Sequence, residues 1–285
     1  SKAATARLVK VSLESIARLE RLVGEHGRLF HEQQVQGLTC TALQADERHG
    51  YVGSKAQPCW EAELFDPHSR LIVERVQGQR NEALAQELLS KGKTRLRYPQ
   101  GVVLLSDGWE GYASLFPLVF GRPYQPKRQG TRGRKPKLRY RLNRRQAHIQ
   151  IVKRREGKGV VEVSTRLAHG SFKRVQRELD RLGYQKPNTS AIERHNATAR
   201  RMDCFSVRKT LAFARIPETR QARGHWRMTV YNFARPHRSL RIPLAQPSGN
   251  KRYQPRSPAM AAHLTDRIWS ISDILRHQVF PSSHR

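Results

Sequence analysis

The chain has 285 residues, a length that allows one large domain or two ordinary ones. Its 54 Lys and Arg residues outnumber 23 Asp and Glu residues, so the formal net charge is +31 and the pI is about 11.3. This excess argues against a housekeeping metabolic enzyme and indicates a polyanionic partner, most simply nucleic acid. Because 37% of the residues are hydrophobic and several windows are amphipathic, we expect a folded protein rather than a disordered one.

Membrane insertion and secretion are not indicated by the sequence. The longest apolar candidate, residues 112–120, is far shorter than the roughly 20 residues of a spanning helix. No charged-then-apolar leader follows Ser1, and the missing Met suggests a processed N-terminus. Cys40, Cys59 and Cys204 are scattered and odd in number, which argues against a disulfide framework or a zinc finger. We therefore expect a cytoplasmic protein with no membrane partner.

The N-terminal segment predicts two helices, at residues 3–9 and 13–23, joined by a tight turn. Ser12 is the expected N-cap of the second helix, and Gly24 is the expected stop. This spacing suits the last part of a helix-turn-helix, whose complete form needs a further helix upstream; an ordinary α-hairpin is the alternative. The outward residues expected to contact DNA are Ser15, Arg18 and Arg21.

The next part of the chain predicts a mixed α/β sheet with helices on both sides. Strands are expected at residues 39–46, 59–65, 70–76 and 102–105, and helices at 81–89 and 109–119. The short, continuously apolar run at 102–105 is typical of a strand buried on both faces.

A strongly basic segment follows at residues 122–145, with eleven Lys or Arg and no Asp or Glu. Such a segment cannot pack as a core, so we expect an extended arm that binds phosphates. Residues 132–136 resemble a minor-groove hook, in which arginines follow A·T-rich DNA. The expected contacts are Lys127, Arg128, Arg132, Arg134, Lys135, Lys137, Arg139, Arg141, Arg144 and Arg145.

Beyond the arm, the pattern predicts a hairpin and then mostly helices. The hairpin pairs residues 147–154 with 160–165. Helices are expected at residues 172–182, 189–202, 225–233 and 265–275.

Three carboxylates stand out because this chain has few. Asp46 closes the first predicted strand, and Asp107 follows the buried strand, at the end of the sheet where ligands bind in open α/β folds. Glu193 begins a helix on which Asn196 and Arg200 share its face. Acids from two strand ends and one helix would form an oxygen-rich site for Mg²⁺, with a role in phosphoryl transfer.

Each carboxylate also has a purely structural interpretation. Asp107 with Gly108 makes a good turn after a strand. Glu193 could complete a capping box begun by Ser190. Asp46 and its acidic neighbour could pair with Arg48 as solvated charges.

An ordered set of short motifs resembles the DDE transposases of bacterial insertion sequences, particularly the type encoded by insertion sequence one and its relatives. The acids lie in Asp46-Glu47, in Ser106-Asp107-Gly108-Trp109 with Tyr112 behind it, and in Thr189-Ser190-x-Ile192-Glu193-Arg194-x-Asn196. Two further matches are Arg208-Lys209-Thr210-Leu211-Ala212-Phe213 and Tyr231-Asn232-Phe233-x-Arg235-Pro236-His237-x-Ser239-Leu240. The resemblance covers nearly the whole chain.

The resemblance implies a ribonuclease H-like fold with Asp46, Asp107 and Glu193 as the catalytic and metal-binding triad. Residues implied to support the site are Asn196, Arg200, Arg194 at the DNA backbone, and His237, whose turn could simply end a helix. Two departures stand out: the Cys-rich zinc element typical of the family is missing, and 193 − 107 = 86 residues separate the second and third acids. Glu162 and Glu178 are the alternative third acids.

We expect three regions: residues 1–36, a partial helix-turn-helix and helical connector; 37–245, a ribonuclease H-like catalytic domain with a basic arm and hairpin insertion at about 122–165; and 246–285, a tail with one helix. The expected function is that of a prokaryotic, nucleoid-associated DNA transposase. It would bind the terminal inverted repeats of its element and join a 3′-hydroxyl to target DNA, using two Mg²⁺ ions, which Mn²⁺ could replace, and acting as a homo-oligomer. The alternatives are a metal-dependent structure-selective nuclease and a non-catalytic DNA-binding protein.

Overall fold

Six strands form one mixed sheet in the computed structural model, which describes residues 2–127, 134–157, 159–207, 212–249 and 251–281. The strands are β1 (Ala42–Arg48), β4 (Trp60–Phe65), β5 (Ile72–Gly78), β6 (Val103–Asp107), β9 (Ala147–Glu156) and β10 (Gly159–His169). Their order is β10-β9-β6-β1-β4-β5, in which β1, β6 and β9 are parallel and the others pair antiparallel. The predicted mixed α/β class is confirmed, and the sheet is compatible with a ribonuclease H-like fold.

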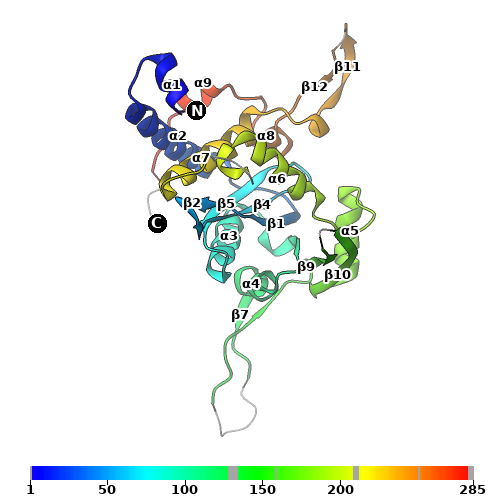
Figure 1. Cartoon of the computed structure of the whole chain (residues 1–285). Coiled ribbons are helices and arrows are strands. Elements are labelled where there is room, and N and C mark those ends of the chain that lie inside the picture. The colour runs from blue at the N-terminus through cyan, green and yellow to red at the C-terminus, as the bar shows by residue number, and fades with distance from the viewer. Residues whose placement is uncertain (1, 128–133, 158, 208–211, 250, 282–285) are drawn as a thin grey trace.

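Helices flank this sheet (Figure 1). They are α1 (Lys2–Val9), α2 (Leu13–Gln34), α3 (Glu82–Arg95), α4 (Glu110–Phe120), α5 (Phe172–Leu182), α6 (Ser190–Met202), α7 (Pro217–Thr229), α8 (Pro258–Ala261) and α9 (Ile271–Arg276). Short helical turns lie at Pro99–Gly101, Cys204–Ser206, Val230–Ala234 and Arg238–Leu240. The predicted bounds of α5 are confirmed, and those of α4 and α6 differ by one residue.

Strand alternation divides the side chains of β1 between two helical layers. Leu43 and Ala45 pack into the larger core, to which α3 and α4 contribute. Ala42 packs on the opposite face with α5, and Gln44 on that face is hydrogen-bonded to α6. Consecutive polar residues at the end of β1 therefore face different helices.

The helix that begins at Leu13 does not stop at Gly24, contrary to the expectation from sequence. α2 continues to Gln34 because Gly24 lies against α7, where a Cβ at this position would overlap Ala222. The glycine thus allows two helices to approach closely instead of ending one. The predicted N-cap is confirmed, since the Ser12 hydroxyl accepts a hydrogen bond from the Ser15 amide at 3.0 Å.

The hairpin expected as part of an insertion lies inside the main sheet. β9 pairs in parallel with β6 through five residue pairs, and β10 extends the sheet beyond it. The first half of β9 is buried, and Ala147, Ile149 and Ile151 pack in the hydrophobic core, so β9 is a core strand. The described residues on either side of the basic segment's centre extend away from the sheet, from the short ribbon of β7 (Arg122–Tyr124) and β8 (Arg139–Arg141) (Figure 1).

Other boundaries also differ from the sequence expectations. α7 begins at Pro217, eight residues before the predicted start, because a proline at the first helical position is favourable. The C-terminal region has two short helices, α8 and α9, where one was expected. Two further ribbons join β2 (Tyr51–Val52) with β3 (Ser54–Pro58), and β11 (Ile242–Ser248) with β12 (Lys251–Gln254). Among the described residues, no helix combines the length and apolar character needed to cross a bilayer.

The contact between α2 and α7 gives a stability prediction. We expect Gly24→Ala to lower the free energy of unfolding by about 1–3 kcal/mol, because the added methyl forces the two helices apart. Urea denaturation measures the change. Gly101→Ala is the control, since nothing lies within 4 Å of a Cβ at that position. Equal stabilities of the two variants would contradict this account of Gly24.

Candidate active site

Three carboxylates meet where the parallel strands β1 and β6 end. Asp46 and Glu47 come from β1, and Asp107 is the last residue of β6. One oxygen from each carboxylate lies within 4.8 Å of the others. Two of these acids, Asp46 and Asp107, were predicted from the sequence, and the sheet brings them together as expected for the carboxyl ends of adjacent parallel strands.

Glu47 was not predicted as a site residue, and the only role considered for it from the sequence was a solvated pairing with Arg48. Its side chain is only 3% exposed and accepts hydrogen bonds from the Tyr112 hydroxyl and, at 3.2 Å, from Arg80 Nε. Arg80 also lies 3.6 Å from Asp107, so one cation faces two of the acids. The solvated pairing of this acidic stretch with Arg48 is wrong, because Arg48 is buried.

Asp107 is held by the turn that follows its strand. Its Oδ1 accepts a hydrogen bond from the Trp109 amide at 3.0 Å. Gln150 on β9 donates its side-chain amide to the carbonyls of Trp109 and Asp107, at 2.9 and 3.3 Å. The turn and the site are therefore compatible, since the turn leaves Oδ2 directed toward Arg80.

A buried amide on β1 anchors the start of the helix that carries the third predicted acid. Gln44 accepts a hydrogen bond from the Ile192 amide at 2.9 Å and donates one to the Asn188 carbonyl at 2.9 Å. Both partners lie at the start of α6, so Gln44 determines where the first turn of the helix meets the sheet. Strand periodicity alone marks Gln44 only as an inward-facing polar residue.

Glu193 faces the same cleft as the other acids, but it is bound to a lysine. Its carboxylate accepts hydrogen bonds from Lys153 on β9 and, at 2.7 Å, from the Thr189 hydroxyl. Burial alone would raise the pKa of Glu193, but these two hydrogen bonds lower it below its ordinary value. The capping-box interpretation is wrong, because Thr189, not Ser190, is the N-cap and makes no side-chain cap.

The cleft around these acids has a volume of about 700 Å³. Asp46, Asp107, Glu193, Asn196 and Arg200 all line it, so the predicted triad and two of its predicted neighbours share one cavity. The residues on the cleft that were not predicted include the cations Arg80, Lys153 and Arg155.

The other predicted support residues and alternative acids lie elsewhere. Arg194 and His237 line a different cavity. Glu162 is exposed on β10 and pairs with Arg154, while Glu178 is a buried residue of α5 and accepts a hydrogen bond from Thr41 at 2.5 Å. Neither alternative acid lines the cleft. Glu193 is therefore the helical acid that shares a cavity with the strand acids.

The acids affect one another's protonation. Burial, with repulsion from Glu47 and Asp107, raises the pKa of Asp46 to about 6. Burial also raises the pKa of Glu47, although the hydrogen bond from Tyr112 opposes this shift. Carboxylates in such proximity are costly unless a cation or a proton compensates them.

This donor set fits a divalent cation. All the candidate ligand atoms are carboxylate oxygens, which suit Mg²⁺ and Mn²⁺ and give no preference to softer metals. Burial raises the pKa of Asp46, and repulsion from Glu47 and Asp107 adds to the shift, so a cation held between these carboxylates would be stabilising. Asp46, Glu47 and Asp107 form the compact set, and Glu193 faces them from α6.

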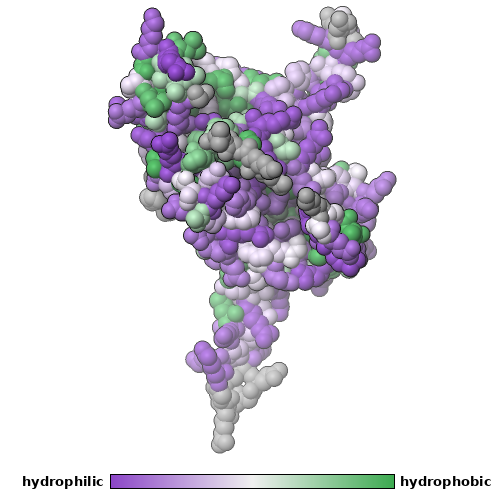
Figure 2. Space-filling view, viewed as in Figure 1, coloured by the Kyte–Doolittle hydropathy of each residue, from purple (hydrophilic) through white to green (hydrophobic). Residues whose placement is uncertain are grey.

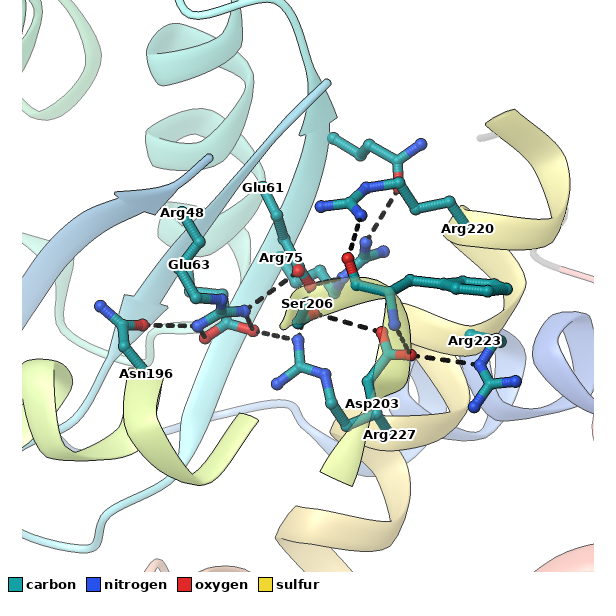
Figure 3. Close-up of polar contacts among 12 residues, drawn as sticks. Arg48, Glu61, Glu63, Arg75, Asn196, Asp203, Ser206, Arg220, Arg223 and Arg227 are labelled. Atoms are coloured by element: carbon teal, nitrogen blue, oxygen red, sulfur yellow. Dashed lines mark hydrogen bonds and ion pairs between the residues drawn. The ribbon is translucent and has the colours of Figure 1, made fainter. Parts of the chain in front are cut away.

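A buried ionic cluster lies directly beneath Asp46. Arg48 donates to Glu63 at 2.7 Å, and Arg227 on α7 donates to Glu61 at 2.5 Å and to Glu63 at 2.6 Å (Figure 3). Arg75 on β5 donates to Glu61 at 2.5 Å. Although burial alone would raise the pKa of Glu63, the surrounding arginines hold it well below its ordinary value.

Asn196 connects this cluster to the acids. Its Oδ1 accepts a hydrogen bond from Arg48 at 2.5 Å, and its Nδ2 donates one to Asp46 Oδ2 at 2.6 Å (Figure 3 shows the first). The buried His195 on the same helix lies 2.9 Å from Glu63, and burial lowers its pKa. The orientation of Asp46 therefore depends on α6 and on the buried arginine.

The residues predicted to contact DNA are on the surface wherever the structure describes them. Ser15, Arg18 and Arg21 are exposed on α2. The described basic residues of the arm are also exposed, namely Lys127, Arg134, Lys135, Lys137, Arg139, Arg141, Arg144 and Arg145. Figure 2 shows mostly hydrophilic residues on the described part of the arm, and hydrophobic residues interspersed with hydrophilic ones over α1 and the start of α2. Arg128, Arg132 and residues 208–211 lie outside the described residues.

Comparisons with known proteins find no family model that matches the chain and no curated protein that is significantly similar to it.

The buried cluster gives a second stability prediction. We expect Glu63→Gln to lower the free energy of unfolding by about 3–5 kcal/mol, because Arg48 and Arg227 would remain buried with too little compensating charge. Chemical denaturation measures the loss. Glu87→Gln is the control; it breaks an exposed pair with Lys91 and should change stability by less than about 0.5 kcal/mol. A Glu63→Gln protein as stable as the control would show that the cluster is dispensable.

Proposed function

We propose that this protein is a DNA transposase with a ribonuclease H-like catalytic domain. It would bind the terminal inverted repeats of a mobile element, cleave DNA, and join the resulting 3′-hydroxyl to target DNA. Asp46, Asp107 and Glu193 would be its catalytic triad, and two Mg²⁺ ions, which Mn²⁺ could replace, would be its cofactors. Two element ends must be held together for such joining, which favours a homo-oligomer. The protein would act in the cytoplasm, at the nucleoid.

One observation carries this proposal: the two strand acids and the helical acid line the same open cleft of about 700 Å³ in a chain with a net charge of +31. The acids provide only oxygen ligands, while Arg80, Lys153 and Arg155 border them. A site that binds cations inside a strongly cationic protein suits a substrate that brings many negative charges, as DNA does. The sheet order and the positions of the acids at parallel strand ends support the same assignment.

Asp46, Asp107 and Glu193 would hold the ions, with Glu47 as a fourth oxygen donor. When bound, the ions would neutralise charge at the scissile phosphate and lower the cost of forming the attacking oxygen and releasing the leaving oxygen. Asn196 would keep Asp46 oriented through its hydrogen bond of 2.6 Å. Glu193 would exchange its lysine partner for metal, which frees Lys153 to contact a phosphate.

The chemistry would be two in-line displacements at phosphorus. Water would first replace the 3′-oxygen of a phosphodiester, leaving a 3′-hydroxyl and a 5′-phosphate. That 3′-hydroxyl would then attack a phosphodiester of the target, forming a new phosphodiester and releasing a target 3′-hydroxyl. The protein would contribute positioning and electrostatic stabilisation and would form no covalent bond to DNA.

The first functional test is strand transfer. Labelled DNA ends with 3′-hydroxyls and randomised terminal sequences are offered with a supercoiled plasmid in Mg²⁺ or Mn²⁺. We expect Asp46→Asn, Asp107→Asn and Glu193→Gln each to reduce joining by about 100-fold or more, because each keeps its shape but loses a charged ligand. Glu162→Gln should join like the wild type, since Glu162 lies outside the cleft.

Other outcomes would replace the proposal. Nicking without joining would identify a metal-dependent, structure-selective nuclease. Binding that survives metal chelation, with no reaction by any variant, would identify a non-catalytic DNA-binding protein. Loss of joining in Glu162→Gln but not in Glu193→Gln would reassign the third acid.

A second functional test addresses the arm. Replacing the basic residues between Lys127 and Arg145 with Ser and Gln should weaken DNA binding and flatten its dependence on salt. Each lost phosphate contact should reduce the slope of log K against log salt concentration by about 0.9. Fluorescence anisotropy at several salt concentrations measures both effects. The control is Leu138→Ser, which alters the arm at an exposed apolar residue and should leave the slope unchanged. If the variant with the neutralised arm also kept the wild-type slope, the arm would not contact the DNA phosphates.

A further inference from the structure

A second cleft lies on the other side of α6, and cations rather than acids line it. Its volume is about 900 Å³, and its walls come from the start of α6, the turn between β4 and β5, the turn after α7, and the base of the β11–β12 ribbon. None of the described residues that line it is Asp or Glu. We call it the arginine pocket, after Arg70, Arg194, Arg238 and Arg241.

These arginines differ from the buried ones beneath the acids. Within the described part of the chain, Arg70, Arg194 and Arg238 form no ion pair with a carboxylate. Arg241 lies over the ring of Tyr253, 3.8 Å from its centre. Burial and the nearby arginines lower the pKa of His237, which lines the same pocket, to about 4. Positive charge is therefore concentrated here without internal compensation, a state that an anionic ligand would stabilise.

The position of Arg70 is fixed by an unusual backbone conformation. Its φ is +62°, in the left-handed region that side-chain-bearing residues rarely adopt. Asp66 stabilises this turn by accepting hydrogen bonds from the His68 amide at 2.9 Å and the Ser69 hydroxyl at 2.5 Å. The turn thus keeps an arginine at the pocket despite a local conformational cost.

The arginine pocket and the acid cleft share α6 as a wall. Glu193 lines the acid cleft, whereas Arg194, the next residue, lines the arginine pocket. We propose that the arginine pocket binds the phosphodiester backbone of the DNA whose reacting strand occupies the acid cleft. This inference rests on the proposed function for the identity of the ligand, and arginine is the residue best suited to bind its phosphate groups.

The test measures DNA binding separately from catalysis. Binding of a short labelled duplex is followed by anisotropy in EDTA over a range of salt concentrations. We expect Arg70→Gln combined with Arg238→Gln to bind about tenfold more weakly, with a salt slope reduced by about 1.8 for two lost phosphate contacts. The control combines Lys173→Gln with Arg177→Gln, which removes the same charge from exposed positions on α5 and should keep the wild-type slope.

A second readout locates the DNA. Tyr253, exposed at the pocket, is replaced by the photo-crosslinker p-benzoylphenylalanine. We expect a crosslink to the labelled DNA that is lost when Arg70 and Arg238 are also replaced and kept when the α5 pair is replaced. Thermal unfolding confirms that each variant is folded.

Three outcomes would overturn the inference. The first is a pocket variant whose slope equals that of the control. The second is a crosslink that survives replacement of the arginines. The third is a thermal shift with inorganic phosphate that needs the arginines while the DNA slope is unchanged, which would assign the pocket to free phosphate. The binding assay contains EDTA, so it does not depend on catalysis. If strand transfer fails but the replaced arginines still weaken DNA binding and reduce its salt slope, only the proposed function is rejected.

Discussion

Glu61 and Glu63 are buried on the same face of β4, and two carboxylates in that position are stable only because Arg48, Arg75 and Arg227 surround them. The arginines come from β1, β5 and α7, so no single element satisfies the cluster by itself. Removing one partner would leave a buried charge with too little compensation, which is far costlier than losing an exposed ion pair. The cluster therefore requires the sheet and the helices above it to assemble in one arrangement.

The candidate active site depends on this arrangement. In the antiparallel pairing of β1 with β4, Asp46 lies directly opposite Glu63, a juxtaposition of like charges that would be unfavourable alone. Arg48 and Asn196 compensate for it, because the amide accepts from the arginine and donates to Asp46. The same buried charges that hold α6 and α7 on the sheet therefore also determine how Asp46, one of the three clustered carboxylates, is oriented.

The sequence predicted the elements with strong local signals. Residues close together in the sequence were enough to predict the apolar run of β6, the periodicity of α5 and the acids at strand ends. Glu47, Arg80 and Gln44 were not found, since their roles depend on partners distant in sequence, such as Tyr112. A buried Asp-Glu-Arg run has the same composition as an exposed one, and only the neighbouring strand distinguishes them. Gly24 was misinterpreted for the same reason, because a helix stop and a helix contact both favour glycine.

Helical geometry explains how one short helix borders two clefts of opposite charge. Successive residues of an α-helix point about 100° apart, so Glu193 and Arg194 face different sides of α6 although they are adjacent in the chain. A carboxylate that binds cations and a guanidinium that binds phosphates would neutralise each other if they shared a side. The body of the helix keeps them apart, while Gln44 and Asn196 hold that helix in place. The separation lets a protein of high positive charge keep a small acidic cluster on one side of α6 and a group of arginines on the other.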